Sequence, residues 1–299
     1  MSARVRRVAI LGHTRRPGVQ RAAARLAAVL KRACTVRFAD DLARAVEPEA
    51  EPLRARSGQA LLPLARWCDL LISLGGDGTA LRGARALAGR SGALMPINLG
   101  GLGFLTVAEE RESIPALQAV MKGKWPIARR RLVGAVVRRA GRVVHRGRAL
   151  NDAVVKAAGG YAALHLRMTA LGHDLGHLVA DGIVCASASG STAYSLSAGG
   201  PVLAPDVDAF VVTPACPHTL GSRPLVLPLR GVVRLRVLGT SDHAMLLLDG
   251  QEGVGLAPGD EVDLGLSRAT VRVVVNPDHS FGRALQEKLG WQGSERRSM

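Results

Sequence analysis

Aromatic side chains are scarce in this chain: Phe, Trp and Tyr together make up 3% of its 299 residues. So few rings are a poor supply for the base-stacking platforms with which proteins bind single-stranded nucleic acids. Lysine is scarce too, with 5 of the 40 basic residues, and the arginines are spread along the whole chain. The net charge of +16 is therefore weak evidence for nucleic-acid binding, and we expect no nucleic-acid partner.

Long apolar runs and paired cysteines are also lacking. No run approaches the ~18 apolar residues that a membrane-spanning helix needs. The run at 8–11 that follows the basic N-terminus is too short for the apolar region of a signal peptide. The 4 cysteines are scattered with no CxxC pair, which suits a reducing compartment without structural zinc. We therefore expect a cytoplasmic protein with no membrane partner.

The most informative stretch is 70–79, Leu-Leu-Ile-Ser-Leu-Gly-Gly-Asp-Gly-Thr. Its apolar half is typical of a buried parallel strand, and 80–90 has helical spacing. The segment 75–79 is then a strand-to-helix turn at the carboxyl end of a strand, where open α/β sheets bind ligands. Glycines let the backbone approach a bulky anion, and the helix start offers free N–H groups. Asp77 would repel phosphate unless it takes a proton or holds a metal ion; the alternative is a glycine-rich loop with a helix-capping aspartate.

The first half of the chain alternates between strand and helix patterns. We predict strands at 7–11, 35–39, 70–74 and 93–97, helices at 18–32 and 80–90, and at 43–66 a surface excursion with one helical turn. Prolines and a glycine among charged residues mark that excursion. Such alternation predicts a doubly wound, Rossmann-like α/β domain over residues 1–130.

The pattern of apolar and polar residues changes after about residue 130. Short β-branched or alternating runs are separated by polar turns, and we predict strands at 132–138, 142–148, 162–169, 232–238, 244–248 and 269–275. This pattern indicates a β-rich, sandwich-like domain over 131–276. Residues 280–291 return to helical spacing. Since a short isolated helix needs a surface to pack on, we expect 277–299 to dock back on the N-terminal domain, with the last eight residues frayed.

Further motifs follow the glycine-rich turn in a fixed order. They are NLGGLGFLT at 98–106, Asn-Asp at 151–152, Asp-Gly at 181–182, GSTAYSLSAGGP at 190–201, CPHTL at 216–220, Asp-Gly-Gln at 249–251 and KLGW at 288–291. This ordered set resembles the NAD kinases, the bacterial type in particular, from about residue 5 to 291. The GGDGT turn alone is shared with lipid kinases of the diacylglycerol kinase superfamily and, more loosely, with phosphofructokinases. The segment 190–201 after an Asn-acidic pair is far more specific.

The resemblance implies transfer of a phosphoryl group to the 2′-hydroxyl of the adenosine ribose of NAD, giving NADP. It implies ATP as donor, with inorganic polyphosphate as an alternative, and Mg²⁺ or another divalent ion. Asp77 is the expected general base, because a ribose hydroxyl is a poor nucleophile until a nearby carboxylate accepts its proton. The phosphate turn would be Gly75, Gly76, Gly78 and Thr79. Arg82, one helical turn further on, would neutralise a substrate phosphate; a solvated helix face explains it equally well.

The same resemblance implies the residues that hold NAD. Asn151 and Asp152 would bind its ribose and nicotinamide side, since an amide beside a carboxylate offers donor and acceptor to paired hydroxyls. The remaining NAD contacts would be Asp77, Gly78, Arg82, Phe104, Asp181, Ser189, Thr192, Ala193, Tyr194, Ser197 and Gln251. Taken singly, the Asn-Asp, Asp-Gly and Asp-Gly-Gln segments would read as turns, and Phe104 as core.

Departures from the family pattern bear on specificity. The usual Thr-Pro-Thr is Ser187-Ala188-Ser189 here; Ser189 keeps a hydroxyl, and the loss of the proline removes a rigid turn, which is expected to loosen the pocket. Val179 stands where some members have a basic residue, which leaves the preference between NAD and NADH open. His173 and His177 have i, i+4 spacing, but flanking glycines oppose a helix, so we expect no metal site from the protein there. Because homo-oligomers are usual in this family, the resemblance implies a homodimer or homotetramer. A lipid kinase and a nucleotide-sensing or nucleic-acid-binding protein remain the alternatives.

Overall fold

The computed structural model describes residues 5–46, 61–100, 103–159, 163–240, 243–278 and 281–291. The chain divides into two compact units. Unit 1 comprises residues 1–129 and 271–299, and unit 2 comprises residues 130–270. The strands β6 (Ile127–Arg139) and β17 (Glu261–Val274) each continue from one unit into the other.

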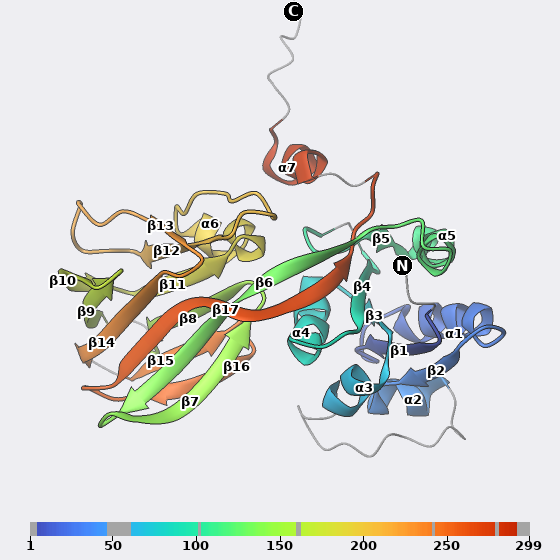
Figure 1. The fold of residues 1–299 in the computed structure, drawn as a ribbon, viewed down its shortest axis with the longest axis horizontal. Coiled ribbons are helices and arrows are strands. Elements are labelled where there is room, and N and C mark those ends of the chain that lie inside the picture. Colours follow the sequence, from blue (N-terminus) through green and yellow to red (C-terminus); the bar gives the residue numbers. More distant parts are fainter. Residues whose placement is uncertain are drawn as a thin grey trace, which may run out of the picture. The chain divides into compact units, whose positions relative to one another are not determined.

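Unit 1 alternates strands and helices (Figure 1). Its elements are β1 (Arg7–Gly12), α1 (Val19–Leu30), β2 (Thr35–Phe38), α2 (Asp40–Val46), α3 (Leu61–Trp67), β3 (Leu70–Leu74), α4 (Asp77–Leu87), β4 (Ala93–Asn98), β5 (Ala108–Glu109), the 3₁₀ helix η1 (Glu110–Glu112), α5 (Ser113–Met121) and α7 (Phe281–Leu289). The strands lie in the order β2-β1-β3-β4, all parallel, and β4 also pairs in parallel with β5 and the end of β17.

Helices cover both faces of this parallel sheet. One core joins Val8 and Ile10 of β1 to the buried side of α1. On the opposite face, α4 approaches the strands at Gly83, where a Cβ would lie 2.9 Å from a methyl carbon of Leu94 and 3.3 Å from one of Leu71. Because both faces are covered, the strands are continuous apolar runs, as parallel strands usually are. The predicted doubly wound α/β fold is confirmed.

Several local predictions in unit 1 were wrong. The described ends of the segment 43–66 belong to the helices α2 and α3, where one helical turn was predicted; the rest of that predicted excursion, residues 47–60, lies outside the described residues. Pro63 lies in the first turn of α3, where the missing N–H of proline has no helical partner to lose. The helix α4 begins at Asp77 rather than at residue 80. The helix α5 was not predicted at all.

Unit 2 is built almost entirely of strands. Besides most of β6 and β17, it contains β7 (Arg142–Ala149), β8 (Asp152–Ala157), β9 (Leu164–Ala170), β10 (His173–Ala180), β11 (Gly182–Ser187), η2 (Ser189–Thr192), α6 (Tyr194–Ser197), β12 (Ala209–Ala215), β13 (Leu225–Pro228), β14 (Val232–Thr240), β15 (Ala244–Leu248) and β16 (Glu252–Leu256). One sheet has the order β10-β9-β14-β17-β6-β7, and the other the order β13-β12-β11-β8-β15-β16. His173 and His177 lie on the strand β10, so they are not on a helix, in line with the flanking glycines that opposed one.

The two sheets of unit 2 enclose one apolar core. It combines Val133 of β6 and Leu235 of β14 in the first sheet with Val155, Cys185 and Phe210 of the second. The other face of the second sheet carries a smaller cluster around Val184 and Val211, against which Leu203 packs. This sandwich-like arrangement confirms the predicted β-rich second part of the fold. The strands β8, β10, β11, β12, β13 and β16 were not predicted.

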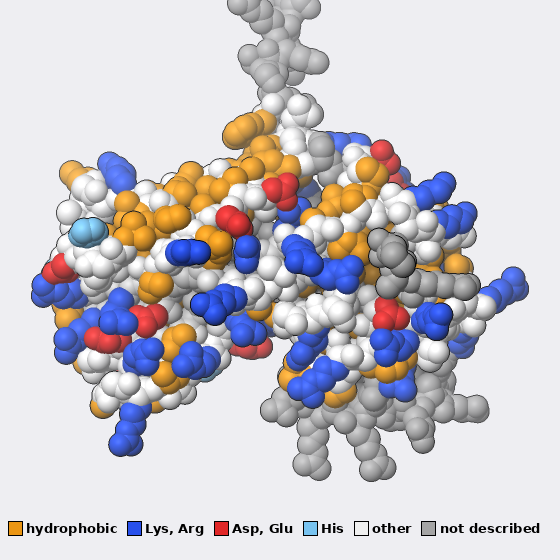
Figure 2. Space-filling model, viewed as in Figure 1, with side chains coloured by type: hydrophobic (Ala, Val, Ile, Leu, Met, Phe, Trp, Pro, Cys, Tyr) orange, Lys and Arg blue, Asp and Glu red, His pale blue; other side chains and the backbone are white. Residues whose placement is uncertain are grey.

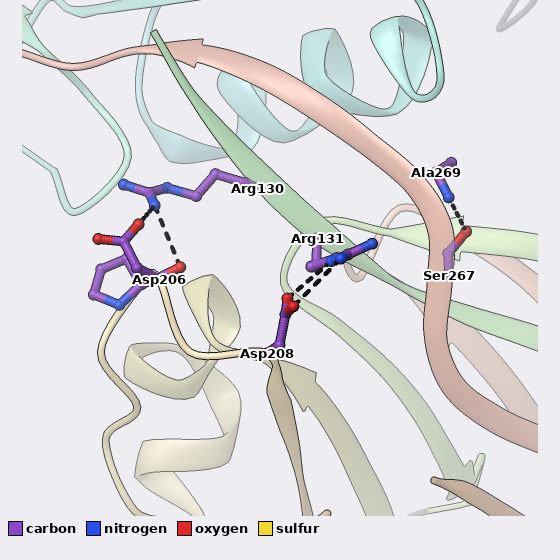
Figure 3. Close-up of polar contacts among 7 residues, drawn as sticks. Arg130, Arg131, Asp206, Asp208, Ser267 and Ala269 are labelled. Atoms are coloured by element: carbon purple, nitrogen blue, oxygen red, sulfur yellow. Dashed lines mark hydrogen bonds and ion pairs between the residues drawn. The ribbon is translucent and has the colours of Figure 1, made fainter. Parts of the chain in front are cut away.

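Two arginines of β6 anchor the segment that leads from α6 to β12. Arg130 donates to Asp206 Oδ1 at 2.6 Å and to the Pro205 carbonyl at 3.3 Å, and Arg131 Nε donates to Asp208 Oδ1 at 2.9 Å (Figure 3). Because the carboxylates of Asp206 and Asp208 are exposed, each ion pair adds only ~0–1 kcal/mol to stability. Their main effect is to orient this segment along β6.

The distribution of charged and apolar groups can be compared with the predictions about nucleic-acid and membrane partners. On the face drawn in Figure 2, Lys and Arg side chains are dispersed among acidic, apolar and uncharged groups, not gathered in one stripe. Among the described residues, no helix is both long and apolar enough to span a membrane.

Candidate active site

The glycine-rich turn joins β3 to α4 in unit 1. Gly75 has φ +151°, and a Cβ at this position would lie 2.5 Å from Thr79 Oγ1, so only glycine fits there. Its N–H donates to the Ile97 carbonyl at 3.0 Å. Gly76 is the N-cap of α4, and Asp77 is the first helical residue. The turn thus presents the positive end of a helix, with glycine backbone accessible to an anion.

Arg16 is a candidate site residue that was not predicted from the sequence. It lies in the loop between β1 and α1, and its side chain reaches the turn. Cβ atoms placed on Gly75 and Gly76 would lie 3.4 and 3.1 Å from Arg16 Nη1, so the two glycines make room for this guanidinium. An exposed guanidinium beside a helix N-terminus can bind a phosphate through paired N–H donors. The only signal in the sequence was an arginine pair after a strand, which is common in this arginine-rich chain.

The Asp77 carboxylate is largely buried against the loop that follows β4. A Cβ on Gly103 would lie 2.3 Å from Asp77 Oδ1, so the backbone of this loop presses on the carboxylate. Burial raises the pKa of Asp77, while N–H groups of Leu105 and Phe104 and the charge of Lys288 oppose the rise. Within the described residues, Asp77 Oδ1 has no hydrogen-bond partner. The group is therefore a carboxylate of raised basicity with one buried oxygen that is unsatisfied among the described residues.

The other predicted residues of unit 1 lie near this turn along the chain. Gly78 and Thr79 belong to the first turn of α4, with Gly78 exposed and Thr79 half-buried. Arg82 lies one turn further on and is half-buried. Phe104 is half-buried and approaches Asp77 through its backbone N–H. Gly101 and Leu102, from the motif at 98–106, lie outside the described residues.

In unit 2, Asn151 and Asp152 lie where β8 begins, and both are buried. Asn151 Oδ1 is a buried acceptor with no partner in the described part of the chain. Burial and the nearby Asp249 raise the pKa of Asp152 to about 7. An orphaned amide oxygen beside a carboxyl group that titrates near neutrality is a typical arrangement for binding polar ligand groups.

The Asp-Gly-Gln segment forms the turn between β15 and β16. The Gln251 N–H donates to the Leu248 carbonyl at 3.0 Å, and Asp249 and Gly250 have φ of +49° and +63°. Gln251 itself is exposed on this turn. The buried polar group is instead Asp249, whose carboxylate accepts N–H bonds from residues 150–152. Sequence reasoning missed Asp249 because an Asp-Gly pair is also a common hairpin turn.

The segment 187–197 is tied to the backbone beside Asn151. Ser187 Oγ donates to the Leu150 carbonyl at 2.5 Å and accepts the Gly190 N–H at 3.2 Å. A Cβ on Gly190 would lie 2.0 Å from the Asn151 carbonyl oxygen, so η2 rests directly on that residue. The Ser187 hydroxyl thus links the backbone at Leu150 to the backbone at Gly190.

The remaining predicted NAD residues follow in the same part of unit 2. Ser189, Thr192 and Ala193 are half-buried, and Tyr194 is 46% exposed, so its ring is available for stacking. Ser197 is exposed at the end of α6, and Asp181 is exposed between β10 and β11. Asp181 also has a partner that was not predicted, because a hydrogen bond to its carboxylate raises the pKa of the Cys216 thiol.

Comparison with known proteins places these features in a family. Residues 8–125 match the ATP-NAD kinase N-terminal domain, and residues 150–275 match the ATP-NAD kinase C-terminal domain. An NAD kinase of Treponema denticola is 40% identical over 76% of this chain and 80% of its own length. An NAD kinase of Geobacter metallireducens is 36% identical over 79% of this chain and 83% of its own.

Solved structures agree. A yeast NADH kinase complexed with NADH has a TM-score of 0.88 and 26% identity, covering 99% of this chain and 91% of that one. An NAD kinase from Archaeoglobus fulgidus shares the fold, with a TM-score of 0.70, 23% identity and coverage of 95% of this chain and 97% of its own. The fold and the two matched domains define a transferase of the kinase class. The chain belongs to the NAD kinase family.

Proposed function

We propose that this kinase transfers the γ-phosphoryl group of ATP to the 2′-hydroxyl of the adenosine ribose of NAD, with Asp77 as general base. The 2′-oxygen forms a bond to the γ-phosphorus, the bond from that phosphorus to the β–γ bridging oxygen breaks, ADP leaves, and the hydroxyl proton passes to Asp77. The observation that carries this proposal is the buried Asp77 carboxylate, with its raised pKa and an oxygen that lacks a partner among the described residues. A base is most effective when its pKa approaches the working pH.

The two units contribute different groups. In unit 1, we assign phosphate binding to the turn of Gly75, Gly76, Gly78 and Thr79, with Arg82. Because the Gly75 and Thr79 N–H groups are bonded to the Ile97 and Gly76 carbonyls, the positive end of α4 and the Arg82 guanidinium would stabilise most of the phosphate charge. In unit 2, Asn151 and Asp152 bind NAD hydroxyl and amide groups. We assign the remaining NAD contacts to Phe104, Asp181, Ser189, Thr192, Ala193, Tyr194, Ser197 and Gln251.

The chemistry of unit 1 fits a divalent ion. Among the described residues, no cluster of three or more acidic, His or Cys side chains could hold a metal by itself. Mg²⁺ is usually held by one or two carboxylates together with substrate phosphates. Asp77, whose Oδ1 lacks a partner among the described residues, is the carboxylate at the phosphate turn. When bound, the ion would neutralise charge on the transferring phosphate.

Replacing Arg16 by alanine is expected to raise the KM for ATP by about tenfold to a hundredfold, because one charge-assisted phosphate contact is lost. Arg15→Ala is the matched control, since Arg15 is exposed in the same loop. Steady-state kinetics with ATP varied at saturating NAD gives the measurement. If both variants behave like the wild type, Arg16 has no part in phosphate binding.

The deciding experiment is an NADP assay on the purified full chain, with an NADP-specific dehydrogenase as the reporter. NAD and NADH are offered in turn, each with ATP and with inorganic polyphosphate, in the presence of Mg²⁺. We expect NADP from NAD and ATP. The reactions with NADH or with polyphosphate show which other acceptor and donor the enzyme accepts, and they do not bear on the proposal itself. Phosphorylation of diacylglycerol without any NADP would replace the proposal by a lipid kinase. Salt-sensitive DNA binding without kinase activity would replace it by a nucleic-acid-binding function.

We further propose a cytoplasmic homodimer or homotetramer. None of the four cysteines forms a disulfide, which supports a reducing compartment. Unit 2 exposes apolar side chains that another copy could cover, among them Leu220, which is 90% exposed, and Val226. Sedimentation velocity measures the mass in solution, and a monomer at micromolar concentration would contradict the oligomer.

A further inference from the structure

Asp249 is a buried carboxylate that the proposed chemistry does not use. It is 8% exposed and lies in the turn between β15 and β16. Its Oδ1 accepts the N–H groups of Asn151 at 2.8 Å and Asp152 at 3.3 Å, and its Oδ2 accepts that of Leu150 at 3.0 Å. A buried charge needs compensating donors, and here consecutive backbone N–H groups supply them.

We propose that Asp249 is a positioning residue for NAD: its carboxylate holds the backbone of residues 150–152 and so orients the Asn151 and Asp152 side chains toward the dinucleotide. This inference rests on the proposed function, in which those two side chains bind NAD. Asp249 itself needs no contact with the substrate. Its effect passes through the backbone that it holds.

The turn that carries Asp249 is itself held in place. Asp249 and Gly250 both have positive φ, the arrangement of a tight type I′ hairpin turn. For a residue other than glycine this conformation is strained, although aspartate tolerates it better than most. The Asp249 N–H also donates to the Asp152 carbonyl at 2.9 Å, so backbone and side chain both bind the same segment. A strained residue with this many bonds is well determined by its surroundings.

The held segment has the orphaned acceptor. Asn151 is 8% exposed, and its Oδ1 has no partner among the described residues. An unsatisfied buried amide oxygen is destabilising, so the backbone around it must hold it in place. The Asn151 carbonyl accepts the Ser187 N–H at 2.9 Å, while Asp249 binds the Asn151 N–H. Asp249 thus fixes one side of the residue and β11 the other.

Asp249 also affects the charge of Asp152. Burial, and then the negative charge of Asp249, raise the pKa of Asp152 to about 7. The Cys185 thiol of β11 also interacts with Asp152. Burial, and then the negative charge of Asp152, raise the pKa of this thiol. An ionised Asp152 accepts strong, charge-assisted hydrogen bonds from ribose hydroxyls, whereas a protonated one is a weaker acceptor and uses one oxygen as a donor. NAD affinity should therefore fall as the pH drops below about 7.

The test uses the full chain with Asp249→Asn, which removes the charge and replaces one acceptor oxygen by a donor. We expect the KM for NAD to rise about tenfold while the KM for ATP stays unchanged, since about 1.4 kcal/mol of NAD binding is lost. The acid-side transition in NAD affinity should also move to lower pH, because Asp152 loses its neighbouring charge. A merely structural residue would not move that transition. Asp206→Asn, at an exposed carboxylate of unit 2, is the control.

Calorimetric titration with NAD in the absence of ATP gives a second readout, and the melting temperature reports folding. If Asp249→Asn does not fold, Asp249→Glu keeps the charge and displaces the carboxylate by one methylene, with the same selective rise in the KM for NAD expected. An unchanged KM for NAD, or equal losses for NAD and ATP, would overturn the inference. A wild-type protein that makes no NADP would instead overturn the proposed function, so the two failures are distinguishable.

Discussion

Asp77→Asn is expected to lower kcat for NADP formation by about 10²–10⁴-fold, the range that a general base contributes. Asparagine keeps the shape of the side chain but cannot take the ribose proton. Burial raises the pKa of Asp77, which makes its ionised form a better proton acceptor than an exposed aspartate. The loss should appear in kcat, with the KM for ATP little changed, because the turn glycines and Arg16 are left intact.

The control for this prediction is Asp69→Asn. Asp69 immediately precedes β3, so it lies at the opposite end of that strand from Asp77, and it pairs with Arg7 at 2.8 Å. This change should lower stability slightly and leave kcat unaffected. Circular dichroism and melting temperature establish that Asp77→Asn is folded. A folded Asp77→Asn protein with the wild-type rate would exclude Asp77 as the base.

Gly190→Ala is expected to raise the KM for NAD by tenfold or more and to lower the free energy of unfolding by about 1–3 kcal/mol. The added Cβ would lie 2.0 Å from the carbonyl oxygen of Asn151 and 2.5 Å from its Cα. These are backbone atoms, so no side-chain rotation can relieve the overlap. Either Asn151 or the 3₁₀ turn η2 must move, and both belong to the proposed NAD site.

Gly221→Ala is the matched control for the glycine prediction. Gly221 also lies in unit 2, and a Cβ there would have nothing within 4 Å. Denaturant unfolding measures the stability of both variants, and kinetics with varied NAD measures the KM. Equal behaviour of the two alanine variants would show that the close approach of Gly190 to Asn151 has no bearing on NAD binding.

The predictions of strands from the sequence were accurate where an apolar run has clear ends. The predicted strands at 7–11, 93–97 and 244–248 differ from the observed ones by at most one residue at either end, because apolar runs with clear ends mark them. The strands β11 and β12 were missed, and every residue of both is buried. The strand β4 is just as buried, but a strand covered on both faces loses the alternation that identifies strands in a sequence, so only the clear ends of an apolar run can mark it.

Helix ends and prolines account for other errors. The helix α4 begins at Asp77, although Asp-Gly-Thr has the composition of a turn. Pro63 and Pro115 each stand third in α3 and α5, so they lie in a first turn, where proline is tolerated. Local composition cannot distinguish a proline that ends a helix from one that lies in its first turn. Whether a proline ends a helix or lies in its first turn depends on how the neighbouring residues pack in the folded core.

By itself, the sequence determined the local chemistry: the strand, the glycine-lined turn with Asp77, the helix after it, and the order of motifs that identifies the family. These features depend on neighbouring residues, so backbone conformation and periodicity encode them. Only the tertiary structure decided which distant groups complete each cluster. Asp249 binds the N–H of Asn151 across 98 residues of chain, and Arg16 reaches the turn from another loop. Such contacts depend on strand pairing and loop path, and neither can be read from the local pattern.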